Sequence, residues 1–216
     1  MSKEFINQSY YLISVLMIVF GCVFFFLKYE RRKPQAREVV TLAVLCAIAV
    51  ASRAAFTMVP FFKPMMGIIM ITGMAFGAGA GFLTGTVVGF SSNFLFGQGP
   101  WTPWQMFAYG VGGAVAGFLS QKGIMKTEKK IFMSVCGYGI IQFLVGPILD
   151  ACSVFTMGGT LSKEWIGSVF VAGIIPNAIH GAATFLTLFL LGKPMTEKLE
   201  RLKLKYGMMR EEEDEI

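Results

Sequence analysis

The chain has 216 residues, of which 55% are hydrophobic and 15% charged, and its formal net charge is +6. Soluble domains average about a quarter charged residues, so the composition excludes an ordinary soluble protein and predicts an all-α, polytopic membrane bundle. The positive charge does not indicate nucleic-acid binding, because most Lys and Arg residues lie in two connectors and the tail, where membrane topology explains them.

The first predicted membrane helix spans residues 10–27 and is bulky and apolar throughout. A basic connector follows, containing Lys28, Arg31, Arg32, Lys33 and Arg37. Lys and Arg accumulate at the cytoplasmic ends of membrane spans, so we expect the N-terminus to lie outside the cell. We assign residues 1–37 to an extra N-terminal helix with its connector, ahead of a membrane core at residues 38–192.

The second predicted helix, residues 38–58, has alanine at every fourth position. We call these residues the Ala stripe: Ala43, Ala47, Ala51 and Ala55. Small side chains at this spacing let another helix approach closely, either from within the protein or from another subunit. Arg53, near the outer end, needs a partner or water at this depth. We interpret it as half of a structural ion pair with Asp150 rather than as a substrate site.

Two further helices are predicted at residues 65–76 and 82–96, joined by a glycine-rich run at residues 77–81. We expect this run to form a tight turn on the inner side of the membrane. It lacks the Gly-Lys-Ser/Thr sequence of a phosphate-binding loop, which excludes nucleotide binding there. Lys63, in the preceding connector, is expected on the outer side.

The Trp–Pro segment, residues 93–105, has the most unusual composition in the chain. It reads Asn-Phe-Leu-Phe-Gly-Gln-Gly-Pro-Trp-Thr-Pro-Trp-Gln, without a charged residue, and we predict that it is a short outer loop. Prolines and glycines fix the backbone, tryptophans offer flat apolar faces and amides offer neutral hydrogen bonds. This suits an organic ligand with polar edges. An interfacial aromatic anchor followed by a helix with an initial proline is an equal alternative.

The last predicted helices span residues 104–119, 131–149 and 165–191. A connector with four lysines separates the first two and agrees with a cytoplasmic position: Lys122, Lys126, Lys129 and Lys130. In the final helix Pro176 frees a backbone carbonyl, and Asn177 and His180 can face one cavity.

The outer connector at residues 151–163 contains two adjacent glycines and can serve as a lid or as a plain connection. Residues 193–216 are expected to form a charged cytoplasmic tail. The predicted topology is therefore seven membrane spans, with the N-terminus outside and the C-terminus in the cytoplasm.

The sequence offers no pattern for catalysis. A single histidine cannot build a His-rich metal site, and no Ser-His-Asp or Cys-His arrangement has a recognisable spacing. An ion-coupled pump would usually need more ionisable groups within the membrane. We therefore expect no enzyme activity and no bound metal or cofactor, so that uphill transport must draw energy from a partner.

From Glu38 to the C-terminus, the chain resembles the substrate-binding (S) components of energy-coupling factor (ECF) vitamin transporters. The resemblance is carried by the Ala stripe, the short helix that ends at Phe76-Gly77, the following Gly81-Phe-Leu-Thr-Gly85 and the Trp–Pro segment. It implies a six-helix core preceded by one extra span, in a bacterial cell membrane. It also implies vitamin capture at the outer face.

The same resemblance implies partners and a docking surface. Ala43, Ala47 and Ala51 would dock onto a membrane scaffold subunit that carries two cytoplasmic ATPases, and ATP would be used by those subunits and not by this chain. The Trp–Pro segment looks most like those of members assigned to cobalamin or related corrinoids. The implied substrate-binding residues are Asn93, Gln98, Trp101, Trp104, Gln105, Lys63, Asn177 and His180.

Within this reading, Trp101 and Trp104 would wall the corrin ring, and His180 is favoured as a packing residue over a cobalt ligand. Other ligands, such as riboflavin or a queuosine precursor, stay open. Other functions are an ion-coupled secondary transporter or channel acting alone, an intramembrane enzyme acting on lipid, and a structural subunit without a ligand.

Overall fold

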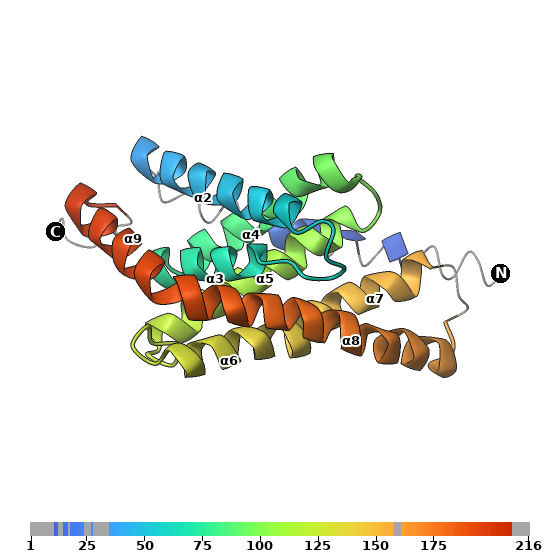
Figure 1. Ribbon diagram of the computed structural model, residues 1–216. Coiled ribbons are helices and arrows are strands. Elements are labelled where there is room, and N and C mark those ends of the chain that lie inside the picture. Colours follow the sequence, from blue (N-terminus) through green and yellow to red (C-terminus); the bar gives the residue numbers. More distant parts are fainter. Residues whose placement is uncertain are drawn as a thin grey trace.

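The computed structural model describes residues 11–12, 15–16, 18–23, 27, 35–157 and 161–208. Within these ranges the chain is helical and contains no strand, which confirms the predicted all-α bundle (Figure 1). From residue 35 onwards the elements are α2 (Ala36–Ala55), α3 (Met65–Phe76), α4 (Ala78–Phe96), α5 (Thr102–Gln121), α6 (Lys130–Ile140), η1 (Ile141–Val145), α7 (Gly146–Thr156), α8 (Lys163–Thr187), η2 (Leu188–Gly192) and α9 (Lys193–Tyr206).

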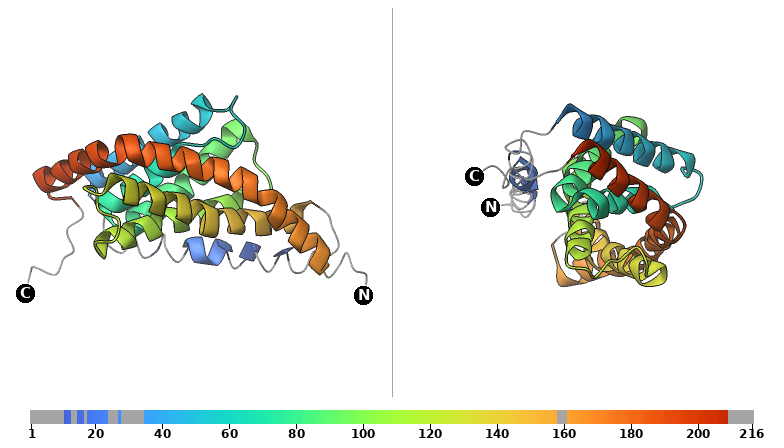
Figure 2. Two further views of the ribbon diagram at one scale, coloured as in Figure 1. Left: turned by 60° about the horizontal axis from the view of Figure 1, so that its bottom comes forward. Right: turned by 90° about the vertical axis from the view of Figure 1, so that its left-hand side faces the viewer.

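Three helical runs are long and apolar enough to cross a membrane: Ala36–Ala55, Lys130–Thr156 and Lys163–Tyr206. The shorter apolar helix α3 is buried along its whole length, so it lies inside protein rather than against lipid. The N-terminal helical residues lie beside the bundle (Figure 2), where Ile18 and Cys22 pack with Phe82, Trp104 and Cys152.

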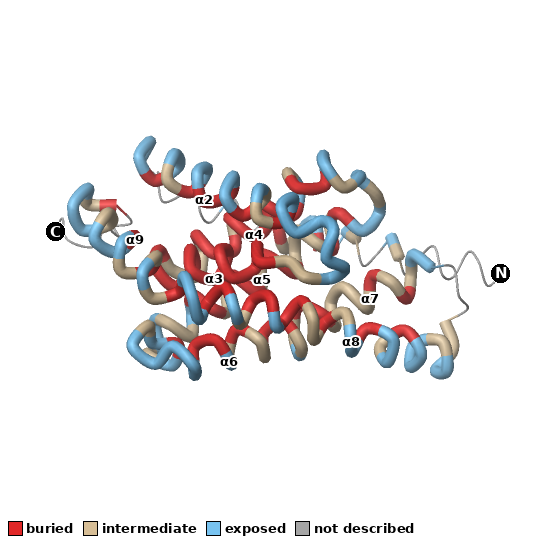
Figure 3. The backbone as a smooth tube through the Cα atoms, in the orientation of Figure 1, coloured by how far each residue is buried: buried red, intermediate tan, exposed pale blue. Residues whose placement is uncertain are grey.

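The centre of the bundle is formed by α3, α4 and α5, whose residues Figure 3 shows as mainly buried or intermediate. Glycines let these backbones touch. A Cβ atom on Gly81 would lie 2.4 Å from the carbonyl oxygen of Gly113, and one on Gly85 would lie 2.2 Å from that of Tyr109. Only a residue without a side chain permits this approach between helices.

The turn predicted at residues 77–81 is present but is confined to Gly77. Helix α4 begins at Ala78, and Gly77 alone connects it to α3, with a φ of 93° that favours glycine. Gly81 serves helix packing instead of a turn. A glycine-rich run looks the same in sequence for both purposes, which explains the error.

Both long C-terminal helical runs contain one π-helical turn followed closely by a proline. Pro147 follows η1 and Pro194 follows η2. A proline has no N–H to bond to the preceding turn, and a widened turn accommodates that loss. The chain therefore continues as a helix to Thr156, so the connector predicted at residues 151–163 is mostly wrong, and its two glycines lie outside the described residues.

The ends of the helices sort into two groups (Figure 1). The start of α2, the connection between α5 and α6, and α9 lie toward one end of the bundle. The α2–α3 and α4–α5 connections, the end of α7 and the start of α8 lie toward the other end. Among the described residues, the basic side chains of the α5–α6 connection and of α9 are thus separated from the connections that carry Lys63, Gln98 and Trp101.

Candidate functional site

A cavity of about 670 Å³ lies between α7, α8 and the α2–α3 connection, and we call it the α7–α8 cavity. Its volume falls within the range of about 300–1,000 Å³ that is usual for small-molecule sites. Its walls are mainly apolar and contain a few polar groups. The residues that carry its chemistry are Phe61, Lys63, Asp150, Trp165, Asn177 and His180.

Two helices hold a carboxylate and an amide together on one wall. Asn177 Nδ2 donates a hydrogen bond to Asp150 Oδ2 over 2.8 Å. Each side chain lies against a glycine of the facing helix: a Cβ on Gly146 would lie 2.4 Å from Asn177 Cγ, and one on Gly173 would lie 2.4 Å from the Asp150 oxygens. The two glycines therefore make room for this pair between α7 and α8.

His180 lies one turn beyond Asn177 and also lines the cavity, as the sequence predicted. It is 6% exposed, and within the described residues its Nε2 atom has no hydrogen-bond partner. A buried polar atom without a partner is costly and calls for an explanation. Pro176, on the same wall, removes an N–H that would otherwise bond to the carbonyl of Ala172, another residue lining the cavity.

The α2–α3 connection contributes Lys63 and Phe61. Burial and the nearby Arg53 guanidinium lower the pKa of Lys63 to about 8. Phe61 has a φ of 61°, in the left-handed region that a bulky side chain rarely adopts. Strained backbone of this kind tends to occur at ligand clamps and active sites, and Phe61 is itself a wall of the cavity.

Trp165, near the start of α8, also lines the cavity. Its Nε1 donates to the carbonyl of Val154 over 3.1 Å, and its backbone N–H bonds to the capping hydroxyl of Ser162. These bonds fix the indole between α7 and α8. Trp165 is thus an aromatic wall of the cavity that the sequence did not predict.

The polar side chains of the Trp–Pro segment bond mainly to one another. Asn93 is buried; its Oδ1 accepts from Arg53 Nη1 over 3.1 Å, while its Nδ2 donates to Thr102 Oγ1 and to Gln105 Oε1. Arg53 also donates to Ser92 Oγ. Gln98 accepts from Thr102 Oγ1 over 2.9 Å and donates to the carbonyl of Phe90. We call this set the polar network: Arg53, Ser92, Asn93, Gln98, Thr102 and Gln105.

The predicted ion pair between Arg53 and Asp150 is wrong. Arg53 bonds to neutral groups of α4 and lies over the Phe96 ring, 4.5 Å from its centroid, whereas Asp150 accepts from Asn177. Arg53 on α2 bonds to α4, whereas Asp150 on α7 bonds to α8. The positions of the two residues in the sequence do not indicate these partners. The predicted Trp–Pro loop is also shorter than expected, because α4 ends at Phe96 and α5 begins at Thr102.

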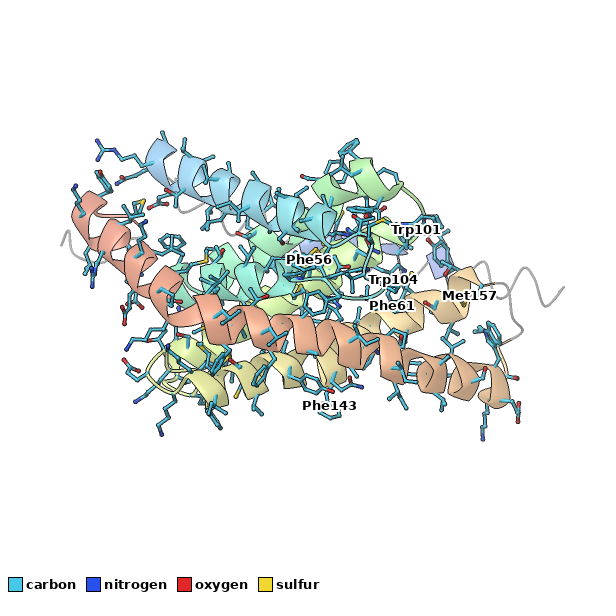
Figure 4. The ribbon with its side chains drawn as sticks, viewed as in Figure 1. Phe56, Phe61, Trp101, Trp104, Phe143 and Met157 are labelled. Atoms are coloured by element: carbon cyan, nitrogen blue, oxygen red, sulfur yellow. The ribbon has the colours of Figure 1, made fainter. Side chains whose placement is uncertain are left out.

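The two tryptophans of the Trp–Pro segment differ in exposure. Trp101 is 40% exposed and lies against Gly99, whereas Trp104 is buried and its ring centroid is 5.9 Å from that of Phe155. Tyr11 of the N-terminal helix donates to the carbonyl of Pro100 over 2.7 Å. Figure 4 shows Trp101, Trp104, Phe61 and Met157 toward the same end of the molecule, but neither tryptophan lines the α7–α8 cavity.

Among the predicted substrate residues, the structure brings Lys63, Asn177 and His180 together around the cavity. It places Asn93, Gln98 and Gln105 in the polar network, away from the cavity walls. Sequence reasoning missed Phe61, Asp150 and Trp165 as neighbours of Lys63. All three lie near the outer ends of predicted membrane helices, and this position is the sequence signal that could have identified them as candidates.

The predicted docking surface lies on a different face. Ala43, Ala47 and Ala51 are exposed along α2, beside the exposed side chains of Val44 and Ile48. The opposite side of α2 is buried against α3 and α4. The Ala stripe therefore does not pack against the described part of this chain, and it is open to another helix or to lipid.

Metal binding finds no support in the described ranges, where no group of three or more His, Cys, Asp or Glu residues could hold an ion.

A family model described as "ECF-type riboflavin transporter, S component" matches residues 33–197, which is more than half of the chain. The chain is similar to a UPF0397 protein of Clostridium perfringens strain SM101, with 27% identity over 153 residues, covering 67% of this chain and 75% of that protein. A UPF0397 protein of Clostridium perfringens strain ATCC 13124 is 26% identical over the same coverage. No solved structure matches the chain significantly.

Proposed function

The chain belongs to the family of ECF-type riboflavin transporter S components, and from this premise we propose that it captures a vitamin in the α7–α8 cavity. The chain is then the substrate-binding, multi-pass membrane subunit of an importer, and not an enzyme. The observation that carries the proposal is the cavity itself. It combines Lys63, Asn177 and His180 with aromatic walls and reaches the α2–α3 connection, which lies at the end of the bundle opposite α9 and the α5–α6 connection.

The orientation follows from the distribution of charge. Lys and Arg accumulate at cytoplasmic membrane ends. The connectors at residues 28–37 and 122–130 and helix α9 therefore belong in the cytoplasm, and the α7–α8 cavity opens outside. A subunit that collects a scarce nutrient needs its binding site on that side.

The size of the cavity supports a vitamin of about the dimensions of riboflavin, the compound named in the family description. Phe61 and Trp165 offer flat apolar surfaces, and the polar groups between them can fix the orientation of a ring. Cobalamin is much larger and would have to project from the cavity. The amides of the Trp–Pro segment, the partners expected for a corrin, already bond to groups of the protein, so cobalamin is less well supported than a smaller vitamin.

Delivery into the cell would use the Ala stripe. Its small, exposed side chains form a smooth surface, and a surface that must dock and release cannot depend on deep interdigitation. We propose that Ala43, Ala47 and Ala51 contact a scaffold subunit, with two cytoplasmic ATPases supplying the energy. Substitution of Ala47 by Leu should then abolish transport and leave ligand affinity unchanged.

The test is calorimetric titration of the purified chain, without partner subunits, with riboflavin, thiamine, biotin, folate and cobalamin. Tight one-to-one binding of one compound supports a solitary capture subunit and identifies its ligand. Uptake into vesicles that contain this chain alone would contradict the proposal in favour of an ion-coupled secondary transporter. Loss of binding in the Ala47→Leu variant would contradict the docking assignment.

A further inference from the structure

The charges of the α7–α8 cavity do not neutralise one another. Lys63 and Asp150 both line it, yet in the described part of the chain the ion pair that meets the salt-bridge distance is Lys193 with Glu197. Unpaired charges are costly in apolar surroundings. Lys63 and Asp150 therefore each retain the capacity to bind a group of opposite charge or polarity.

Lys63 has a second cation as its neighbour. The Arg53 guanidinium bonds to Ser92 and Asn93 and lies over the Phe96 ring, so its partners in the described part of the chain are neutral. Burial together with this guanidinium accounts for the lowered pKa of Lys63. Lys63 lines the cavity and Arg53 lies close enough to affect it, and neither is bonded to a carboxylate among the described residues, so this side of the cavity has a positive potential.

The facing helices present one charged and one polar group to this site. From α7, the Asp150 carboxylate is held by Asn177 in the space above Gly173 and is not within salt-bridge distance of Lys63. From α8, His180 presents its imidazole, and the Nε2 atom lacks a partner among the described residues. Negative and positive character are thus separated across the cavity.

We propose that the ligand carries an acidic group, a carboxylate or a phosphate, which binds Lys63, and hydrogen-bond donors that face Asp150. This inference rests on the proposed function, because it gives the chemistry of the ligand in the same cavity. An acidic group supplies the counter-charge that Lys63 and Arg53 lack, and charge-assisted hydrogen bonds of this kind are the stronger class. The acceptor oxygens of Asp150 select hydroxyl or N–H groups at the other end of the ligand.

The test uses ligands in matched pairs that differ by the acidic group: riboflavin 5′-phosphate with riboflavin, and biotin with biotinamide. Calorimetric titration at pH 7 of the purified full-length chain should show that the acidic member of at least one pair binds at least tenfold more tightly. Lys63→Met should remove this preference. Lys63→Arg should keep it, because a guanidinium retains the charge.

Asp150→Asn is the matched control within the cavity. It removes a charge of opposite sign, so the preference for the acidic member should persist or increase. A neutral member that binds as tightly as its acidic partner in the unmodified chain, or a preference that survives in Lys63→Met, would overturn the inference while leaving vitamin capture intact. If no compound of either kind binds, both the inference and the proposed function fail.

Discussion

The polar network and the α7–α8 cavity lie toward the same end of the bundle and contain similar amounts of polar chemistry, but they use it differently. In the network, Asn93 alone bonds to Arg53, Thr102 and Gln105. In the cavity, Lys63 and His180 Nε2 have no partner within the described ranges. Polar groups that satisfy one another stabilise a fold, whereas polar groups left unsatisfied beside a cavity are available to a ligand.

The largest effect is expected from breaking the network at its centre. Asn93→Leu leaves the buried Arg53 guanidinium and the Thr102 and Gln105 side chains without their shared partner. Unfolding should become easier by about 3 kcal/mol, because unsatisfied buried groups cost about 1–3 kcal/mol each and charged groups more. For a chain of this size, that corresponds to a fall of about 6–12 °C in Tm.

Thermal unfolding in detergent measures this change. Leu95→Ala is the control, because Leu95 lies on the same helix and is exposed, and its effect should stay within about 0.5 kcal/mol. Equal melting temperatures for Asn93→Leu and the unmodified chain would mean that the network does not hold α2, α4 and α5 together.

The next effect concerns the cavity and should appear in affinity rather than stability. Gly173→Val introduces a side chain where the Asp150 oxygens lie 2.4 Å from an ideal Cβ position. The Asp150–Asn177 pair must then move, and ligand affinity should fall about 30-fold, or about 2 kcal/mol. Titration of the bound vitamin measures this loss.

Gly167→Val is the matched control for that substitution. It lies on the same helix, and nothing is within 4 Å of its Cβ position. Both variants therefore carry the same cost of placing valine in a helix, and the difference between their ligand affinities measures the effect on the cavity. A similar loss of affinity in both variants would show that any valine in α8 weakens binding, and that the space Gly173 leaves for Asp150 is not the cause.

A smaller effect should follow the titration of Lys63. An acidic ligand favours the protonated ammonium, so binding raises its pKa above the free value of about 8. Affinity should therefore be full below pH 7 and fall about tenfold between pH 7 and pH 9. Lys63→Arg should show a flat profile over this range, and a flat profile in the unmodified chain would exclude Lys63 from binding.

The ligand-free protein should show the opposite trend in stability. In the unfolded chain Lys63 keeps its proton up to its ordinary pKa of 10.5, while in the folded chain it loses the proton near pH 8. The unfolded state therefore binds more protons between these values, and the contribution of Lys63 to the free energy of unfolding rises with pH. Unfolding curves at pH 7 and pH 9, compared with those of Lys63→Met, isolate this contribution.

The smallest effect is expected at Trp101. This side chain is 40% exposed and lies outside the α7–α8 cavity, so Trp101→Ala should change vitamin affinity by less than about twofold, or about 0.4 kcal/mol. Calorimetric titration measures it. A tenfold or greater loss would restore the Trp–Pro segment as a ligand contact and would favour a ligand large enough to reach it.

Parts of the fold could be predicted because local residues determine them. The bounds of α3 were predicted correctly, since Pro64 precedes the helix and Gly77 ends it. The pairing of Asn177 with His180 on one cavity wall follows from helical spacing. The start of α4 could not be predicted, because a glycine run for helix packing looks like a glycine run for a turn.

The site was only partly predictable for a different reason. Amides at Asn93 and Gln105 are visible in the sequence, but their bond to each other depends on how α4 meets α5. Likewise, Asp150 and Lys63 are 87 positions apart, and only the packing of α7 and α8 beside the α2–α3 connection brings them to one cavity. Composition shows which groups exist, and tertiary structure decides which of them are already bonded.

The helical run from Lys163 to Tyr206 has a mechanical consequence. It contains 44 residues, which at a rise of 1.5 Å per residue gives a rod of about 66 Å, roughly twice the 30 Å thickness of a bilayer core. Asn177 and His180 belong to this rod, and so do the lysines of α9. If this helical run tilts so that one end lies deeper in the bilayer, its other end must move through the headgroup layer. A change in membrane thickness changes the tilt through hydrophobic mismatch, so it should also move the ligand site.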